Sequence, residues 1–226
     1  MNYGQLGKVR RGGDPMKAQA FRTQRAELPE DLWQPLYDRA NLGAAAAAVT
    51  SQVSFFSTAR GQSATLITSA TTAASKVKTY RDTNMENSNV VPTKLFKFVG
   101  VSIAIIHGVN DNDTAGTAAN GYDRQSIMNG GYLQFRIVDK DILFLPLISL
   151  PELNPWNAVS TTQTAQSVMG SGSGGGIGQA MYAFPVPITL NPYENFSVTA
   201  NFDATPVLTA TADMYVILHG FMRRPT

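Results

Sequence analysis

The two histidines are the residues of this chain with the widest chemical use, because a His side chain titrates near neutral pH and binds metals. His107 and His219 each end an apolar run and precede a glycine, in the stretches IIHG and ILHG. This repeated pattern predicts adjacent strands of one sheet that place both rings at one edge. A hydrolase would also need a serine on a strained turn, and the chain has no Gly-x-Ser-x-Gly elbow. No third ligand stands at a recognisable spacing, so we expect two strand-end residues bonded to loop backbone and no metal site.

Two segments resemble known binding motifs but lack their defining residues. The glycine tract at 170–178, GSGSGGGIG, continues with Gln and Ala, where a phosphate-binding loop needs a lysine and a helix start. Asp111 and Asp113 resemble the start of a calcium loop, yet the glycine and the acid at its twelfth position are missing. We interpret the tract as a flexible loop ordered by a neighbouring subunit and the acids as an Asn/Asp-rich turn, with incidental cation binding as the alternative.

Carboxylates and cysteines provide no catalytic constellation either. Most of the 16 acidic residues are expected in turns or in an early helix. No two of them share a strand face at a spacing that spans a scissile bond. Cysteine is absent, which excludes disulfides, thiolate metal sites and thiol nucleophiles. We therefore expect a protein that is not an enzyme and needs no cofactor.

Basic residues are concentrated at the start of the chain, although the net charge is only +2. Residues 1–26 are expected to form a Gly-containing arm with a single acid, Asp14. Such an arm commonly contacts nucleic acid or an anionic membrane surface, and a merely solubilising, disordered terminus is the alternative. The candidate contact residues are Lys8, Arg10, Arg11, Lys17, Arg22 and Arg25.

The composition favours large protein–protein contacts. Hydrophobic residues make up 43% of the chain, enough for a full core, and charged residues only 15%. A surface rich in Thr, Ser, Asn and Gln repels copies of itself only weakly. Residues 1–30 contain no apolar core of signal-peptide length, and no apolar run is long enough to cross a bilayer. We expect a soluble chain made without export.

Most of the chain after residue 48 shows strand patterns. Residues 27–48, which include Trp33, are expected to form a short helical segment, because Pro29 and two acids suit a first helical turn. A tight hairpin is expected at 139–140 and a bulge at Gly100, while Pro185 points to an edge strand interrupted there. Residues 62–82 give mixed signals. Alternation predicts strands at 53–57, 95–107, 132–138, 142–147, 181–186, 196–202 and 213–222.

These elements indicate an all-β sandwich or barrel. No helical period separates the strands, so a βαβ repeat is excluded. The connections at 108–130 and 148–179 are long for a compact domain, and such loops commonly carry binding or assembly surfaces. The expected organisation is an arm at 1–26, a helical segment at 27–48 and a sandwich at 49–226.

Three stretches resemble the jelly-roll major capsid proteins of icosahedral viruses, and most closely those of tailless bacterial viruses. The first joins TNM at 83–85 to VPTKLFKF at 91–98, and the second is LPLISLP at 145–151. The third is ITLNPYENFSV at 188–198, with FMRRP at 221–225 closing the chain. The resemblance covers residues 50–224 in style of sequence and rests on no single signature.

The resemblance implies a single jelly roll of about eight strands, because a double jelly roll needs about sixteen. It also implies a coat subunit that assembles with copies of itself into trimers or larger units and then a shell, beside other capsid proteins. The arm would face the genome or an internal membrane, and the protein would be made in the host cytoplasm and reside in the virion. A glycan- or receptor-binding spike or lectin-like module is the alternative, with Tyr122, Trp156 and Tyr193 as candidate aromatics. A hydrolase using His107 and His219 is a third hypothesis.

Overall fold

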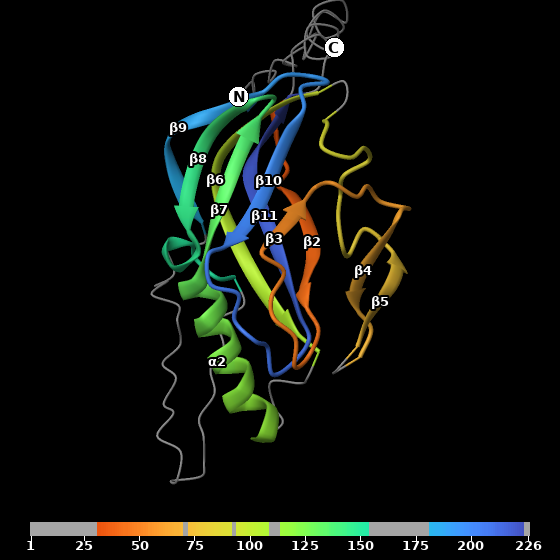
Figure 1. The fold of residues 1–226 in the computed structure, drawn as a ribbon. Helices are drawn as coiled ribbons and strands as arrows, with labels where there is room; N and C mark the ends of the chain where they lie inside the picture. The colour runs from red at the N-terminus through yellow and green to blue at the C-terminus, as the bar shows by residue number, and fades with distance from the viewer. Residues whose placement is uncertain (1–30, 70–71, 92–93, 109–113, 154–180, 224–226) are drawn as a thin grey trace, which may run out of the picture.

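The computed structural model is a β-sandwich with a hairpin and a helix attached to it (Figure 1). The structure describes residues 31–69, 72–91, 94–108, 114–153 and 181–223, with the side chains of 31 and 114–121 left aside. The basic arm and most of the second long loop therefore lie outside the described residues.

Strands make up most of the described chain. In chain order they are β1 (Asp31–Trp33), β2 (Leu36–Gly43), β3 (Gln52–Phe55), β4 (Ser63–Ile67), β5 (Ala73–Val77), β6 (Leu95–His107), β7 (Gly131–Ile137), β8 (Lys140–Pro146), β9 (Tyr182–Leu190), β10 (Phe196–Phe202) and β11 (Ala212–Arg223). The helix α2 spans Thr114–Gly130, and the 3-10 turn η1 spans Leu147–Ser149.

The strand order identifies a jelly roll. One sheet has the order β1-β11-β6-β9, with β2 also on β11, and the other has β3-β10-β7-β8. β1 and β2 pair with successive parts of β11, so they form one edge strand broken at Pro35. With these counted once and β4–β5 set aside, eight strands remain. The first pairs with the last, the second with the seventh, the third with the sixth and the fourth with the fifth. This antiparallel roll confirms the predicted single jelly-roll sandwich.

The core lies between the two sheets, because each strand turns every second side chain inward. In β10 the predicted alternation is confirmed: Phe196, Val198, Ala200 and Phe202 are all buried. Phe98 and Phe135 meet across the two sheets, edge to face, with ring centroids 5.0 Å apart. Aromatic pairs of this geometry contribute about 0.5–1.5 kcal/mol beyond the area they bury.

The bulge expected at Gly100 is confirmed. The register of β6 shifts against β11 between His219 and Gly220, and against β9 between Phe98 and Gly100. A Cβ on Gly220 would lie 2.4 Å from the Lys97 carbonyl oxygen, so the strands approach too closely for any other residue.

The helix expected at 27–48 is wrong for residues 31–43, which form β1 and β2. The leucines that suited a helical face also fit a strand, since Leu36 and Leu42 turn inward at even spacing and are buried. Pro35 disfavours a continuous helix, and backbone pairing with β11 outweighs a weak helix signal.

The long connection expected at 108–130 is also wrong in part, because residues 114–130 form α2. Its described half is fixed by buried side chains: Ile127 packs in the hydrophobic core, Asp123 bonds to the loop before β11, and Arg124 bonds to β6. In the second long connection, η1 and a short extension follow β8. There the Leu153 N–H donates to the Ile103 carbonyl oxygen.

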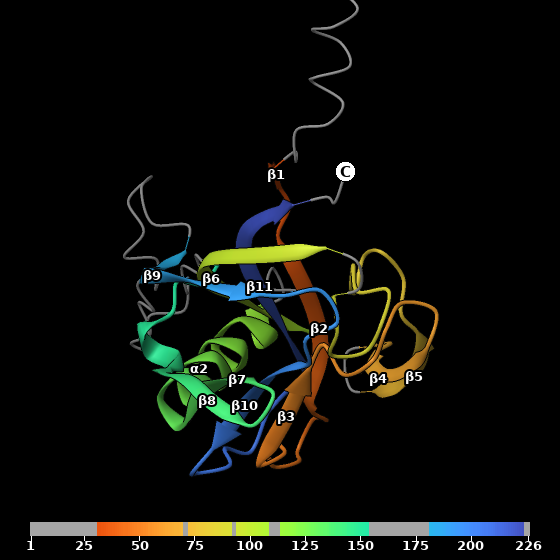
Figure 2. The ribbon, with the colours of Figure 1, turned by 90° about the horizontal axis from the view of Figure 1, so that it is seen from above.

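β9 lies at a sheet edge, as predicted, but Pro185 does not end it. Residues 184–187 bulge out opposite the single residue Val99, and pairing with β6 resumes at Ile188. The segment of mixed signals at 62–82 contains the hairpin β4–β5, which packs beside β2 (Figures 1 and 2). β8 and β9 lie together on the opposite narrow side of the sandwich.

Candidate functional site

The two histidines occupy different places from those predicted. β6 and β11 are neighbours, as the repeated pattern indicated, but they run antiparallel. His107 lies opposite Ala212 and His219 opposite Gly100, so about seven residues of strand, roughly 23 Å, separate the two rings along the sheet. The prediction of one shared edge is therefore wrong. His219 also lies within β11 rather than at its end.

His219 forms a hydrogen bond with Ser102, whose Oγ lies 2.7 Å from His219 Nε2. Ser102 is completely buried, so its hydroxyl is not presented to a substrate. Burial lowers the pKa of His219, which favours the neutral imidazole. The Trp33 ring lies 6.2 Å from the His219 ring, centroid to centroid. The pair is thus a packed polar contact beneath an exposed tryptophan.

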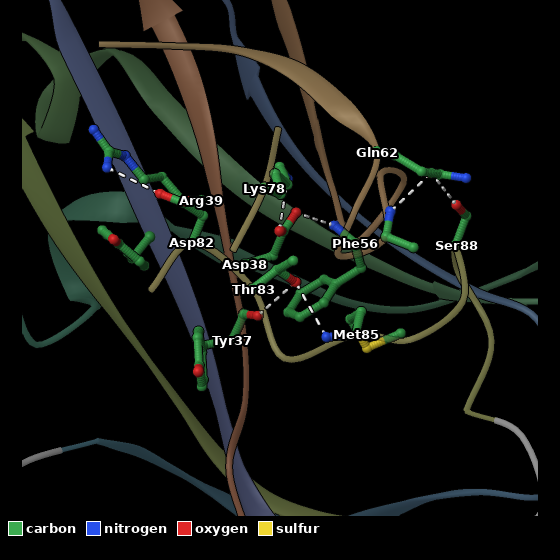
Figure 3. A network of polar contacts seen from close by, with 12 residues as sticks. Tyr37, Asp38, Arg39, Phe56, Gln62, Lys78, Asp82, Thr83, Met85 and Ser88 are labelled. Atoms are coloured by element: carbon green, nitrogen blue, oxygen red, sulfur yellow. Dashed lines mark hydrogen bonds and ion pairs between the residues drawn. The ribbon is translucent and has the colours of Figure 1, made fainter. Parts of the chain in front are cut away.

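Buried charges cluster instead beside β2, in a network that no sequence pattern indicated (Figure 3). Lys78 Nζ lies 2.7 Å from Asp38 Oδ1. Arg39 bridges two further acids, with its Nε 2.7 Å from Asp213 and its Nη1 3.2 Å from Asp82. All three carboxylates are fully buried, and burial raises the pKa of Asp38 and of Asp213 against the pull of their basic partners.

This network fixes the β4–β5 hairpin and the turn after it to the first sheet. The Ile67 N–H of β4 donates to Asp213, and the Thr79 N–H donates to Asp82. Two phenol groups complete the attachment: Tyr37 donates its hydroxyl to the Tyr80 carbonyl, and Tyr215 donates to the Arg81 carbonyl. The turn at 79–82 is therefore held from below by hydrogen bonds from β2 and β11.

This turn and the residues beside it present an aromatic and basic surface, which we call the Tyr80 patch: the exposed Val77, Tyr80 and Arg81 and the partly exposed Arg60. Tyr80 is 66% exposed, and the Arg60 guanidinium lies 3.8 Å from the centre of its ring. Asp82, the acid of this segment, is buried against Arg39. Within the described residues Arg60 and Arg81 form no ion pair. The patch therefore carries positive charge beside a stacked tyrosine.

A second exposed surface follows β8 on the opposite narrow side. The β8 patch consists of Val138, Ile142, Phe144 and Ile148, all of them exposed apolar side chains. Phe144 is 54% exposed and lies beside Tyr132 of β7, with ring centroids 6.1 Å apart. Val138 adopts a positive φ of 52°, a strained conformation for a β-branched residue. The patch extends along the whole strand and its two ends.

A shallow groove of about 400 Å³ lies on the outer face of the first sheet. It is lined by Leu95, Lys97, Val99, Pro187, Phe221 and Arg223. Trp33, 52% exposed, packs edge-on against Phe221 at its side. Tyr122 and Tyr193 are both exposed, Tyr122 in α2 shortly before β7 and Tyr193 in the turn before β10. Because β7 and β10 run antiparallel, the two tyrosines lie at opposite ends of this strand pair and form no cluster.

The other predicted site residues fall outside the described chain. These are Lys8, Arg10, Arg11, Lys17, Arg22 and Arg25 of the arm, Asp111 and Asp113, the glycine tract and Trp156. Among the described residues, no group of three acidic, histidine or cysteine side chains is placed to hold a metal ion. No helix of the described chain has the length and apolar character to cross a membrane.

No family model, curated protein or solved structure matches this chain. The jelly-roll fold is therefore established by its strand pairing, and function has to be inferred from the surfaces of the molecule. Exposed apolar or basic side chains gather at the two patches on opposite narrow sides and at the groove beside Trp33.

Proposed function

We propose that this protein is a structural coat subunit that assembles with copies of itself into a virus shell. The observation that carries the proposal is the β8 patch, an apolar strip along one side of a jelly roll. Single exposed apolar side chains are common, but four on one edge strand and the turns at its two ends are typical of a contact surface. The link from jelly roll to coat protein is an analogy of fold, because the same architecture also serves lectins.

The edge strands favour contact through side chains over strand addition. β8 ends in Pro146, and β9 carries Pro185 and Pro187 on its exposed bulge. Proline lacks the N–H that an added strand would need, and bulges turn an edge away from pairing. Copies that meet here would pack the β8 patch against an apolar surface and would avoid open-ended β-aggregation.

A shell needs only modest affinity at each contact, since every subunit makes several contacts at once. The low charge of the chain, 15%, suits such packing. In this proposal the partners are copies of the chain, as trimers or larger units and then a shell, together with other capsid proteins. The basic arm would face the genome or an internal membrane, and the protein would reside in the virion.

Glycan or receptor binding is the second candidate function, and the groove beside Trp33 and Phe221 favours it. Exposed aromatic rings offer apolar faces on which sugars stack, and Lys97 and Arg223 add polar groups. In this second hypothesis Trp33 and Phe221 take the role that the sequence assigned to Tyr122, Trp156 and Tyr193.

The test is the oligomeric state of the purified chain at high concentration, measured by sedimentation velocity and negative-stain microscopy. We expect rings, trimers or shells for the wild type and monomers for Phe144→Arg. Val207→Arg is the control, because Val207 is also apolar and exposed but lies in the loop before β11, where it pairs with Ala48. A wild-type chain that stays monomeric and binds glycans, with loss of binding in Trp33→Ala, would overturn the coat proposal in favour of the second candidate.

A further inference from the structure

The two patches differ in charge as well as in position. The Tyr80 patch lies on the β4–β5 side and the β8 patch on the β8–β9 side, so one subunit presents them in opposite directions (Figure 2). Around the β8 patch, Asp139 is exposed and forms no ion pair within the described residues, and Glu194 stands in the adjacent turn. The adjacency of the two turns is fixed by the bond from Val138 N–H to the Asn195 carbonyl.

A contact between two copies of the same patch would be unfavourable. A Tyr80 patch facing its own copy would bring Arg60 and Arg81 against the same two cations, which costs free energy at a contact. A Tyr80 patch facing the β8 side would place these arginines near Asp139 and Glu194. Lys140 offsets part of that acidic charge, while Asp141 is already paired with Arg136 at 3.3 Å. Opposite patches therefore match in sign, and identical ones do not.

The Tyr80 patch also has the composition of a binding hot spot, and hydrogen bonds already hold its turn in place. Tyr and Arg are over-represented among residues that dominate binding free energy. Because three side chains below the turn, those of Tyr37, Arg39 and Tyr215, already hold it, little conformational entropy is lost when a partner arrives. Val77 and Tyr80 provide apolar area that complements Ile142 and Phe144.

We infer that copies of this chain join side to side in one direction, with the β8 patch of one subunit seated on the Tyr80 patch of the next. The contact is heterologous, so its repetition generates a ring where the rotation between neighbouring copies closes and an open filament where it does not. This inference rests on the proposed function and names the surfaces that perform it.

The experiment uses two full-length variants, each with one side blocked. Phe144→Arg blocks the β8 patch and Arg81→Asp blocks the Tyr80 patch, and both residues are exposed. We expect each variant alone to sediment as a monomer of 24.3 kDa, with association weakened about tenfold or more. An equimolar mixture should form a dimer of one copy of each, because one intact patch of either kind remains, and it should grow no further.

Three further measurements decide the outcome. Lys97→Asp is the charge-matched control on another face, and it should assemble as the wild type does. The double variant Arg81→Asp, Asp139→Arg should regain assembly, because it exchanges the two charges across the contact. Arg81→Asp chains that dimerise on their own would show a contact between like patches, and blocked variants that form wild-type assemblies would show that other surfaces are used. Either result overturns this inference and leaves the coat proposal standing, whereas a monomeric wild type overturns the coat proposal itself.

Discussion

Lys78 Nζ lies 2.7 Å from Asp38 Oδ1, and both side chains are buried where the β4–β5 hairpin meets β2 (Figure 3). The second carboxylate oxygen of Asp38 accepts the Phe56 N–H at 2.6 Å. The acid thus links three segments that are distant in sequence. A buried pair contributes less to stability than its Coulomb attraction suggests, but the loss of one partner leaves an uncompensated charge in the interior.

Lys78→Met should therefore destabilise the protein strongly, by about 3–5 kcal/mol in the free energy of unfolding. Urea denaturation measures the loss. Lys76→Met is the matched control, because Lys76 is partly exposed and lies 3.7 Å from Asp82, so its removal should cost about 0–1 kcal/mol. Adding Asp38→Asn to Lys78→Met should recover part of the loss, since the amide oxygen still accepts the Phe56 N–H. A loss below 1 kcal/mol for Lys78→Met would contradict this account.

The strands were predictable where a local pattern alone decides the fold. β6 alternates on both sides of its bulge, at 95–99 and 103–107, and β10 turns Phe196, Val198, Ala200 and Phe202 inward. The turn at 139–140 matches a hairpin between β7 and β8, and Gly100 marks the bulge. Each of these signals lies within a dozen residues. Inward and outward faces then follow from the period of two along a strand.

The charge network and α2 were not predictable, because distant contacts hold them. Asp38 and Lys78 are 40 residues apart, and Arg39 and Asp213 are 174 apart, so no spacing relates them. α2 contains Asn and Gly, which are poor helix formers, and it has no strong apolar stripe. Its described half depends on the loop before β11.

Asp123→Ala tests this dependence. The Asp123 carboxylate accepts the Thr209 N–H and the Ala210 N–H at 2.9–3.0 Å, beneath the lower end of the sandwich. Alanine would leave the buried Ala210 N–H and the partly buried Thr209 N–H without this acceptor, and a buried amide without a partner costs about 1–3 kcal/mol. We expect a lower free energy of unfolding and faster proteolysis within 114–130. Gln125→Ala, an exposed change on the same helix, should alter neither measurement. Equal stability of the two variants would show that α2 is held by other contacts.

The His219 ring provides a pH dependence whose sign is fixed by its surroundings. Burial between β6 and β1 lowers its pKa below the usual value of 6.5, while the unfolded chain keeps the ordinary value. The unfolded state therefore binds the proton more readily than the folded state in the range between the two pKa values. The contribution of His219 to stability is complete above about pH 6.5 and decreases as the pH falls through that range.

We expect the wild-type free energy of unfolding to fall between pH 7.5 and pH 5, and the fall to be smaller in His219→Gln. The glutamine side chain still reaches Ser102 but does not titrate, so the difference between the two curves isolates the histidine. Each unit of pKa shift corresponds to about 1.4 kcal/mol, which sets the scale of that difference. The chain has only two histidines, so NMR titration of the ring protons gives the pKa of His219 directly, with the variant assigning its resonance. A measured pKa at or above 6.5, or parallel stability curves, would show that the ring is solvated in the folded protein.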